Sequence, residues 1–492
     1  MLRNSVLGLI TLLFATTHTG AQEQIATDPA VRIGRLDNGM TYYVRHNAVP
    51  AGRADFYIVF NVGAMEEEDA QQGLAHIIEH MAFRGTRNMP EGTITNFFRS
   101  LGMRVGVNYN AATAIEHTYY MMAGVPLERE SVVDSVLLIL HDWSQFVTLD
   151  EDKVDYERGV VLDELRRRND AHHRLRDKIN PVLYNGSRYG MRNIISDEEQ
   201  IRSFPHQELT DFYARWYRPD LQAVIAVGDF DADEMERKLR EVMSNVPMQE
   251  NPAPKQYYPI PNNELPVVII ATDPELNGTS VNLYVKRAAQ PVDKNNTFDA
   301  LVSRHAHTAL GVLTTWRLTE IARQQDAPFT NASFSSGAIS NSNDALIGGM
   351  MPREGRVGEA FEAFYTEIER IRRYGFEAAE LERFKGMSLE RARQTHSRSA
   401  NRSTGELVQA YMKHYLKNEP VPDAETQWQL DSAALNMLTV EMINALMSGL
   451  ITATNNTIIV SAPESHEASL PSREELTGIM ERTRVCFPPA GL

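Results

Sequence analysis

The chain has 492 residues, with 49 Lys and Arg against 65 Asp and Glu, and a formal net charge of −16 at pH 7. That length is too great for one ordinary hydrophobic core, so two or three domains are expected. A hydrophobic content of 42% with 23% charged residues is typical of a soluble globular protein. The negative charge argues against nucleic-acid binding, because phosphates would be repelled.

The amino terminus has the pattern of a secretory signal peptide. Arg3 precedes an apolar run at Val6–Ala15, and a Thr-Gly-Ala triplet follows. A basic start, a short apolar core and small residues at the end predict cleavage of residues 1–21. The apolar run is shorter than the ~20 residues that a membrane span needs, and no later segment resembles one. Because Cys486 is the only cysteine, no internal disulfide is possible. We expect a periplasmic or secreted protein without a membrane span.

The strongest chemical signal is His76-Ile-Ile-Glu79-His80, which follows a predicted strand at Ala54–Val62. The surrounding segment Gly73–Phe83 lacks proline and carries apolar residues that can pack around the histidines, so it predicts a helix. Helical geometry places His76, Glu79 and His80 on one side. Two neutral imidazoles suit zinc, and a catalytic zinc site needs one more protein ligand plus an open position for water. The order is the reverse of the His-Glu-x-x-His zinc motif.

A second helix that bears carboxylates is predicted at Lys153–Arg168. Its Glu157 and Glu164 are separated by about two turns, so both share one face beside apolar residues. A carboxylate at such an edge is costly to bury without a partner, and a dication is one available partner. The alternative is that both glutamates are solvated and pair with Arg158 and Arg168. This helix alone favours that alternative, whereas the helix together with the histidine pair favours a metal.

These separated motifs, in this order, resemble the pitrilysin/insulinase family of zinc metallopeptidases, the inverzincins. Gly73–Thr86 is similar to the family's active-site helix, Asn110–Thr113 to its edge strand and Glu157–Glu164 to its distal-ligand helix. His141–Trp143 and Gly186–Tyr189 fit the amino-terminal half of longer bacterial periplasmic members. The resemblance implies an α+β fold of two tandem homologous domains that form half of a clamshell. Each domain would be a mostly antiparallel sheet packed with helices.

The resemblance also implies a role for each matching position around the metal. His76, His80 and Glu164 would bind one zinc ion. Glu79 would be the catalytic general base that takes a proton from water and returns it to the leaving amine. Glu157 would orient a ligand histidine, as carboxylates commonly do around metals.

Substrate contacts follow from the same resemblance. In the family an extended peptide adds as a strand to a sheet edge, and Asn110 and Ala111 match that edge. The alternative for these two residues is a plain strand end. The family's far-side domain offers an arginine and a tyrosine to the substrate; Arg323 fits the arginine, but Thr330 stands at the tyrosine position. The alternative for Arg323 is a surface charge at the end of a helix.

The second half of the chain looks like a duplicate of the first. The pattern around Glu157 and Glu164 recurs at Leu381–Arg391, with Phe384 and Arg391 in place of the glutamates, which would abolish metal binding there. A proline-rich polar stretch between the halves predicts a linker. The expected parts are a signal peptide (1–21), a catalytic zinc-binding domain (22–246), a linker (247–266) and an inactive sister domain (267–492). Further predicted strands are Leu221–Val227, Val267–Ala271, Ser280–Val285 and Thr457–Ser461, and further helices are Ser131–Phe146, Asp231–Ser244, Gly358–Arg373 and Ala378–Thr395.

We therefore expect a zinc-dependent endopeptidase that hydrolyses peptides or small unfolded proteins inside a chamber. Family members generally build that chamber from four such domains, and this chain supplies two. The resemblance thus implies a homodimer, or a heterodimer with a second half-length family member, and the missing tyrosine favours the heterodimer. The alternative is a catalytically weak or structural peptide-binding subunit of a two-chain peptidase complex. The intact His, Glu, His and Glu set argues for the enzyme.

Overall fold

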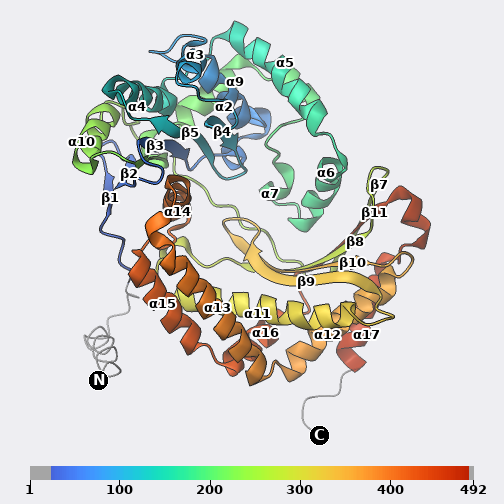
Figure 1. Ribbon diagram of the computed structural model, residues 1–492. Helices are drawn as coiled ribbons and strands as arrows, with labels where there is room; N and C mark the ends of the chain where they lie inside the picture. Colours follow the sequence, from blue (N-terminus) through green and yellow to red (C-terminus); the bar gives the residue numbers. More distant parts are fainter. Residues whose placement is uncertain (1–23, 487–492) are drawn as a thin grey trace, which may run out of the picture.

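Two mixed β-sheets, one in each half of the chain, organise the molecule (Figure 1). This computed structural model describes residues 24–486, so the predicted signal peptide lies outside the described residues. The first sheet contains β1 (Val31–Arg35), β2 (Thr41–His46), β3 (Arg53–Phe60), β4 (Tyr109–Thr113), β5 (Thr118–Pro126) and β6 (Gln222–Gly228). The second contains β7 (Val267–Asp273), β8 (Ser280–Ala288), β9 (Phe329–Ala338), β10 (Asn343–Pro352) and β11 (Asn456–Pro463).

Helices surround both sheets. The first half contributes α2 (Leu74–Arg84), α3 (Thr93–Ser100), α4 (Glu130–Gln145), α5 (Glu151–Arg168), α6 (Ala171–Leu183), α7 (Arg188–Met191), α8 (Glu198–Ser203), α9 (His206–Trp216) and α10 (Ala232–Met243). The second half contributes α11 (Phe298–Ala322), α12 (Val357–Tyr374), α13 (Ala378–Ser397), α14 (Thr404–Lys417), α15 (Ala424–Met437), α16 (Val440–Leu450) and α17 (Arg473–Cys486).

The two sheets repeat one topology. Strand order is β1-β2-β6-β3-β5-β4 in the first and β7-β11-β8-β10-β9 in the second. In each sheet the strand that comes last in sequence runs parallel to one neighbour, β2 or β7, and every other pair is antiparallel. The second sheet therefore matches the first without β1. This confirms the predicted α+β fold of two similar, mostly antiparallel units, while the exact domain limits stay a prediction.

The central strands of the first sheet are buried on both faces. In β3, Phe56 and Ile58 point into the main core with α2 and α4, whereas Tyr57 and Val59 belong to a smaller cluster on the opposite face. Alternate side chains of a strand point to opposite faces, so a strand covered on both sides must be apolar throughout. The near-continuous apolar run in β3 reflects this double cover.

The cover on that second face comes from the other half of the chain. Helix α14 packs Leu407, Val408 and Tyr411 against the first sheet, and the Tyr411 ring stacks on Tyr43 with ring centroids 5.5 Å apart. At its start, Thr404 Oγ1 donates a hydrogen bond of 2.8 Å to the buried Asp55 in β3. Figure 1 shows α14 reaching from the second half to the first sheet.

Helix α6 makes the reciprocal exchange. It follows α5 in the first half, yet its Leu175 and Leu183 pack against Ile269 and Ile459 of the second sheet. Arg174 donates two hydrogen bonds of 2.7 Å to the buried Asp273 at the end of β7. The two halves are therefore joined by a pair of exchanged helices as well as by the linker, which contains no helix or strand between Met243 and Val267.

Across residues 24–486, no individual helix combines the length and apolar character that a membrane crossing requires. Within this described part of the chain, one pair of helices, α15 and α16, reaches that threshold when the two are taken together, and they are bent by 80° relative to each other. Leu435 of α15 and Ile443 of α16 lie in the core of the second half.

Candidate metal centre

Helix α2 places the two histidines. Its Leu74, Ile77, Ile78 and Met81 are buried in the first core, which fixes the orientation of the helix about its axis. The opposite side turns His76 and His80 toward one another, with ring centroids 4.7 Å apart. The structure thus confirms a helix at the predicted segment.

The start of α2 is held by a buried carboxylate. Glu67 accepts hydrogen bonds of 2.9 Å from the backbone nitrogens of Gly73 and Ala75, two of the amides that a helix amino terminus leaves unpaired. Gly73 has a φ of +88°, where a side chain is strained, and a Cβ there would lie 3.1 Å from Ser196. Glycine at this position lets the chain enter the helix beside the residue 196 loop.

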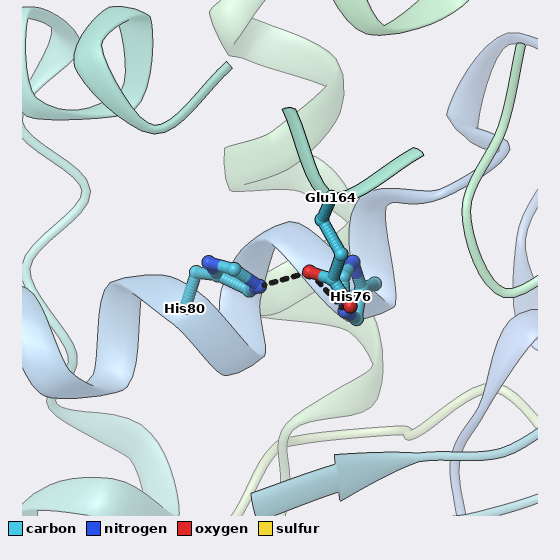
Figure 2. A group of neighbouring side chains, drawn as sticks. All are labelled: His76, His80 and Glu164. Atoms are coloured by element: carbon cyan, nitrogen blue, oxygen red, sulfur yellow. Dashed lines mark ion pairs between the residues drawn. The ribbon is translucent and has the colours of Figure 1, made fainter. Parts of the chain in front are cut away.

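Helix α5 supplies the third side chain. Val154, Val161 and Leu162 bury its apolar face, and Glu164 lies two turns after Glu157. Glu164 Oε2 is 3.3 Å from His80 Nε2 and 3.7 Å from His76 Nε2 (Figure 2). The three potential ligand atoms of His76, His80 and Glu164 all lie within 4.8 Å of one another, the one such group found among the described residues.

These distances fit a tetrahedral zinc ion. Ligands at ~2.0–2.2 Å from a tetrahedral ion are separated from one another by about 3.4 Å. The His80–Glu164 and His76–Glu164 separations of 3.3 and 3.7 Å lie close to that value. Two imidazoles and one carboxylate are also the ligand set of a known class of catalytic zinc sites, in which a fourth position stays open. The residues present therefore fit one zinc ion.

The charges around the cluster also suit a cation. Burial, together with the nearby His80, lowers the pKa of His76 to about 3, so this ring is neutral. Burial alone would lower the pKa of His80, but its bonds to Glu157 and Glu164 raise the pKa to about 9. Metal ligation requires that His80 release the bound proton. The hydrogen bond from His80 in turn lowers the pKa of Glu164 to about 2.

Glu157 lies behind the cluster and is in contact with His80. The residue is 2% exposed, and Oε2 accepts a 3.0 Å hydrogen bond from His80 Nδ1, while Oε1 accepts one from Arg84 Nε. Burial would raise the pKa of Glu157, but the bond to His80 and the charge of Arg84 outweigh it, and the pKa lies below its usual range. Arg158, the partner offered by the alternative reading, instead binds Asp155 and the carbonyls of Ile201 and Phe204.

The alternative for Glu164, an ion pair with Arg168, is present together with the approach to the histidines. Arg168 pairs with its Oε1 at 2.5 Å, as the sequence of the helix suggested, while Oε2 faces the two histidines. The carboxylate therefore has one oxygen for the arginine and one for the cluster.

Glu79 lies on the same helix between the two histidines. Thr113 Oγ1, at the end of β4, donates a 2.6 Å hydrogen bond to Glu79 Oε2. Burial raises the pKa of Glu79, and the Thr113 bond opposes that shift. A carboxylate with a raised pKa beside a metal site is suited to accept and return a proton.

The substrate residues expected from the sequence lie on elements of both halves of the chain. Asn110 is exposed and Ala111 buried on β4, and β4 is the last strand of the first sheet, so one of its edges has no neighbouring strand in that sheet. Arg323 is exposed directly after the carboxyl end of α11 in the second half and does not belong to the metal cluster. In the repeated helix α13, Phe384 is buried in the second core and Arg391 is exposed.

Two contacts were not anticipated from the sequence. Arg84 binds Glu157, and Thr113 binds Glu79. Both residues stand inside the motifs that carried the resemblance, but their partners lie 73 and 34 residues away in sequence. Only the distal-ligand motif pointed to Glu157 as a site residue, and the local pattern offered Arg158 rather than Arg84 as its arginine partner.

Comparisons with known proteins agree with this geometry. Residues 43–194 match the family model described as insulinase, peptidase family M16, and residues 203–387 match the model described as the peptidase M16 inactive domain. The probable zinc protease PqqL of Haemophilus influenzae is 37% identical over 228 residues, which cover 46% of this chain and 24% of that protein. The probable zinc protease PqqL of Escherichia coli is 27% identical over 417 residues, which cover 85% of this chain and 44% of that protein.

Among solved structures, the first half of the periplasmic protease PqqL from Escherichia coli superimposes with a TM-score of 0.87 and 24% identity. The match covers 96% of this chain and all of that one, and it shows a shared fold. This chain spans less than half the length of the curated relatives it matches. Because two family models match in order and the fold agrees, the chain belongs to peptidase family M16, the insulinase and pitrilysin family.

Proposed function

We propose that this protein is a zinc-dependent endopeptidase in which Glu79 is the general base. The observation that carries the proposal is the approach of His76, His80 and Glu164 within 4.8 Å of one another, with Glu79 on the same helix as the histidines. The relatives named as probable zinc proteases support a peptidase of this metal class.

Glu79 and Glu157 would have different roles in hydrolysis. Zinc, when bound, supplies Lewis-acid chemistry that acidifies water and polarises a peptide carbonyl. Glu79 takes a proton from the attacking water onto a carboxylate oxygen and then delivers it to the leaving amine. Glu157 holds the His80 ring through Nδ1, which leaves Nε2 aimed at the cluster.

The free edge of β4 provides a place for substrate. An extended peptide that pairs with this strand would continue the first sheet by one strand and would run past Glu79, to which Thr113 of the same strand is bonded. Asn110 and Ala111 would then contact the peptide mainly through their backbone. We infer that the substrates are unfolded or extended peptides, because a folded chain cannot add a strand at this edge.

We further propose that a second unit of the same fold faces the metal cluster. The relatives are more than twice as long as the segment they share with this chain, which supports a larger assembly. The second unit would come from a second copy of this chain or from another family member, and Arg323 would act on the substrate of that partner. The periplasm is the proposed location, because the PqqL protease of similar fold is described as periplasmic.

The test compares Glu79→Gln with wild type on a library of quenched peptides. We expect the variant to retain zinc and to lose cleavage by at least about 100-fold, the usual contribution of a general base. Glu151→Gln, the same chemical change at an exposed position of α5, serves as the matched control. The native mass of the active fraction shows whether the second unit is another copy of this chain or a different chain. Equal cleavage by the Glu79→Gln variant, or zinc content near zero in intact wild-type protein, would show that the proposal is wrong.

A further inference from the structure

Thr113 stands where the edge strand meets the catalytic helix. It is the last residue of β4, and the residue is 8% exposed. Burial alternates along the strand, so Tyr109, Ala111 and Thr113 share the buried face, whereas Asn110 is exposed on the other. The position places the Thr113 hydroxyl against α2, from which Glu79 projects.

The contact between these two residues is short and directional. Thr113 Oγ1 lies 2.6 Å from Glu79 Oε2, the separation of a hydroxyl that donates to an ionised carboxylate. Such bonds are stronger than bonds between neutral groups. The hydroxyl holds the carboxylate at Oε2, and a hydrogen bond from the Thr113 backbone adds to that hold.

The strand that carries Thr113 is itself held on several sides. Thr113 pairs with Thr118 of β5, and the buried Thr118 donates a 3.0 Å bond to the carbonyl of Val62. In the turn between the strands, Glu116 accepts bonds of 2.5 Å from Tyr189 and 2.6 Å from the backbone nitrogen of Asn341 in the second half. A donor on a strand fixed in this way can impose one orientation on its acceptor.

We propose that Thr113 is a positioning residue for catalysis: its hydroxyl fixes the Glu79 carboxylate in the orientation that faces the water to be deprotonated. The inference rests on the proposed function of Glu79. Strand β4 would then have two roles, because the strand that pairs with the peptide is also the strand that orients the base. Docking of substrate and orientation of the base are thereby set by one element.

The test uses variants that separate the hydroxyl from the shape of the side chain. Thr113→Val keeps the branched shape and removes the donor, whereas Thr113→Ser keeps the donor and removes the methyl group. We expect Thr113→Val to lower kcat by about 10- to 100-fold, as expected for loss of a hydrogen bond to a charged group. KM and zinc content stay near wild type, and Thr113→Ser keeps most of the activity. Thr113→Ala removes the same hydroxyl by a second route and should match the valine variant.

Crystal structures of the metal-free variants give a readout that does not depend on activity. The Glu79 carboxylate should keep its place in Thr113→Ser and leave it in Thr113→Val. An unchanged kcat in both hydroxyl-free variants, or equal losses in the serine and valine variants, would overturn the proposal, as would an unmoved Glu79. If wild type cleaves no peptide while Glu79 moves only in the hydroxyl-free variants, the hydroxyl does hold the Glu79 carboxylate, but the proposed function and the catalytic purpose of that contact both fail.

Discussion

The Glu157→Gln substitution gives a sharp test of how the metal site is built. The glutamate uses Oε2 for His80 and Oε1 for Arg84, two donors on one helix. A glutamine has the same shape but only one acceptor oxygen, so its amide NH₂ must face one of the two donors. One charge-assisted bond is therefore lost, at a cost of about 1.5–3 kcal/mol. If the lost bond leaves the His80 ring less well oriented, zinc affinity falls by about 10- to 100-fold, the usual effect of changing a residue that orients a metal ligand.

The assay is a zinc competition titration against a chromophoric chelator at neutral pH, with Glu151→Gln as the matched control on α5. The control should bind zinc as wild type does, because Glu151 is exposed in the first turn. A Glu157→Gln variant with wild-type zinc affinity would refute the idea that this carboxylate orients His80. A variant that loses zinc only because it unfolds would show a lowered melting temperature in the metal-free state as well, which the titration alone does not reveal.

Two further predictions concern the rest of the molecule. Leu407→Ala should lower the free energy of unfolding by about 2–5 kcal/mol, because this buried leucine of α14 packs against the first sheet. Hydrogen exchange should show lost protection in β2 and β6, whereas the control Gln409→Ala, on the exposed side of α14, should leave that protection unchanged. Protection lost only in the second half would contradict the packing. Burial, with the charges of Lys417 and Lys255, lowers the pKa of His117 from 6.5 to about 4, so its contribution to stability is complete above pH 6.5 and is lost as the pH falls toward about 4. The measurement is the free energy of unfolding by urea, for metal-free protein at about pH 7.5 and about pH 4.5. Between these pH values the free energy of unfolding of His117→Gln should fall by up to ~3 kcal/mol less than that of wild type. Equal decreases in both proteins would contradict the assignment.

Local patterns predicted much of the fold. The helix predicted at Lys153–Arg168 corresponds to α5, and the strand predicted at Val267–Ala271 forms the first part of β7. These predictions succeeded because the periodicity of apolar residues within one segment indicates its secondary structure. The convergence of the histidines on Glu164 also followed from helical spacing combined with the resemblance to the family. The repeated pattern at Leu381–Arg391 indicated a duplication, which the shared strand order confirms.

Long-range partners could not be predicted in the same way. The helical pattern of α14 shows an apolar face but not which sheet receives it, and that sheet belongs to the other half of the chain. Likewise, the Asn-Ala-Ala-Thr sequence indicates a strand, but only the tertiary fold shows that Thr113 reaches Glu79. Such contacts depend on how separate elements dock, which the periodicity of one segment does not record.

The reciprocal placement of α6 and α14 has a consequence for folding. The bond from Thr404 to Asp55 joins residues 349 positions apart, so the face of the first sheet that carries Tyr43 and Tyr57 stays uncovered until α14 has docked. Contacts of such high sequence separation form slowly, because the entropy of loop closure is lost before the contact stabilises the fold. An intermediate in which only the first half has folded therefore exposes an apolar surface that favours aggregation, and a fragment cut at the linker would keep that surface exposed.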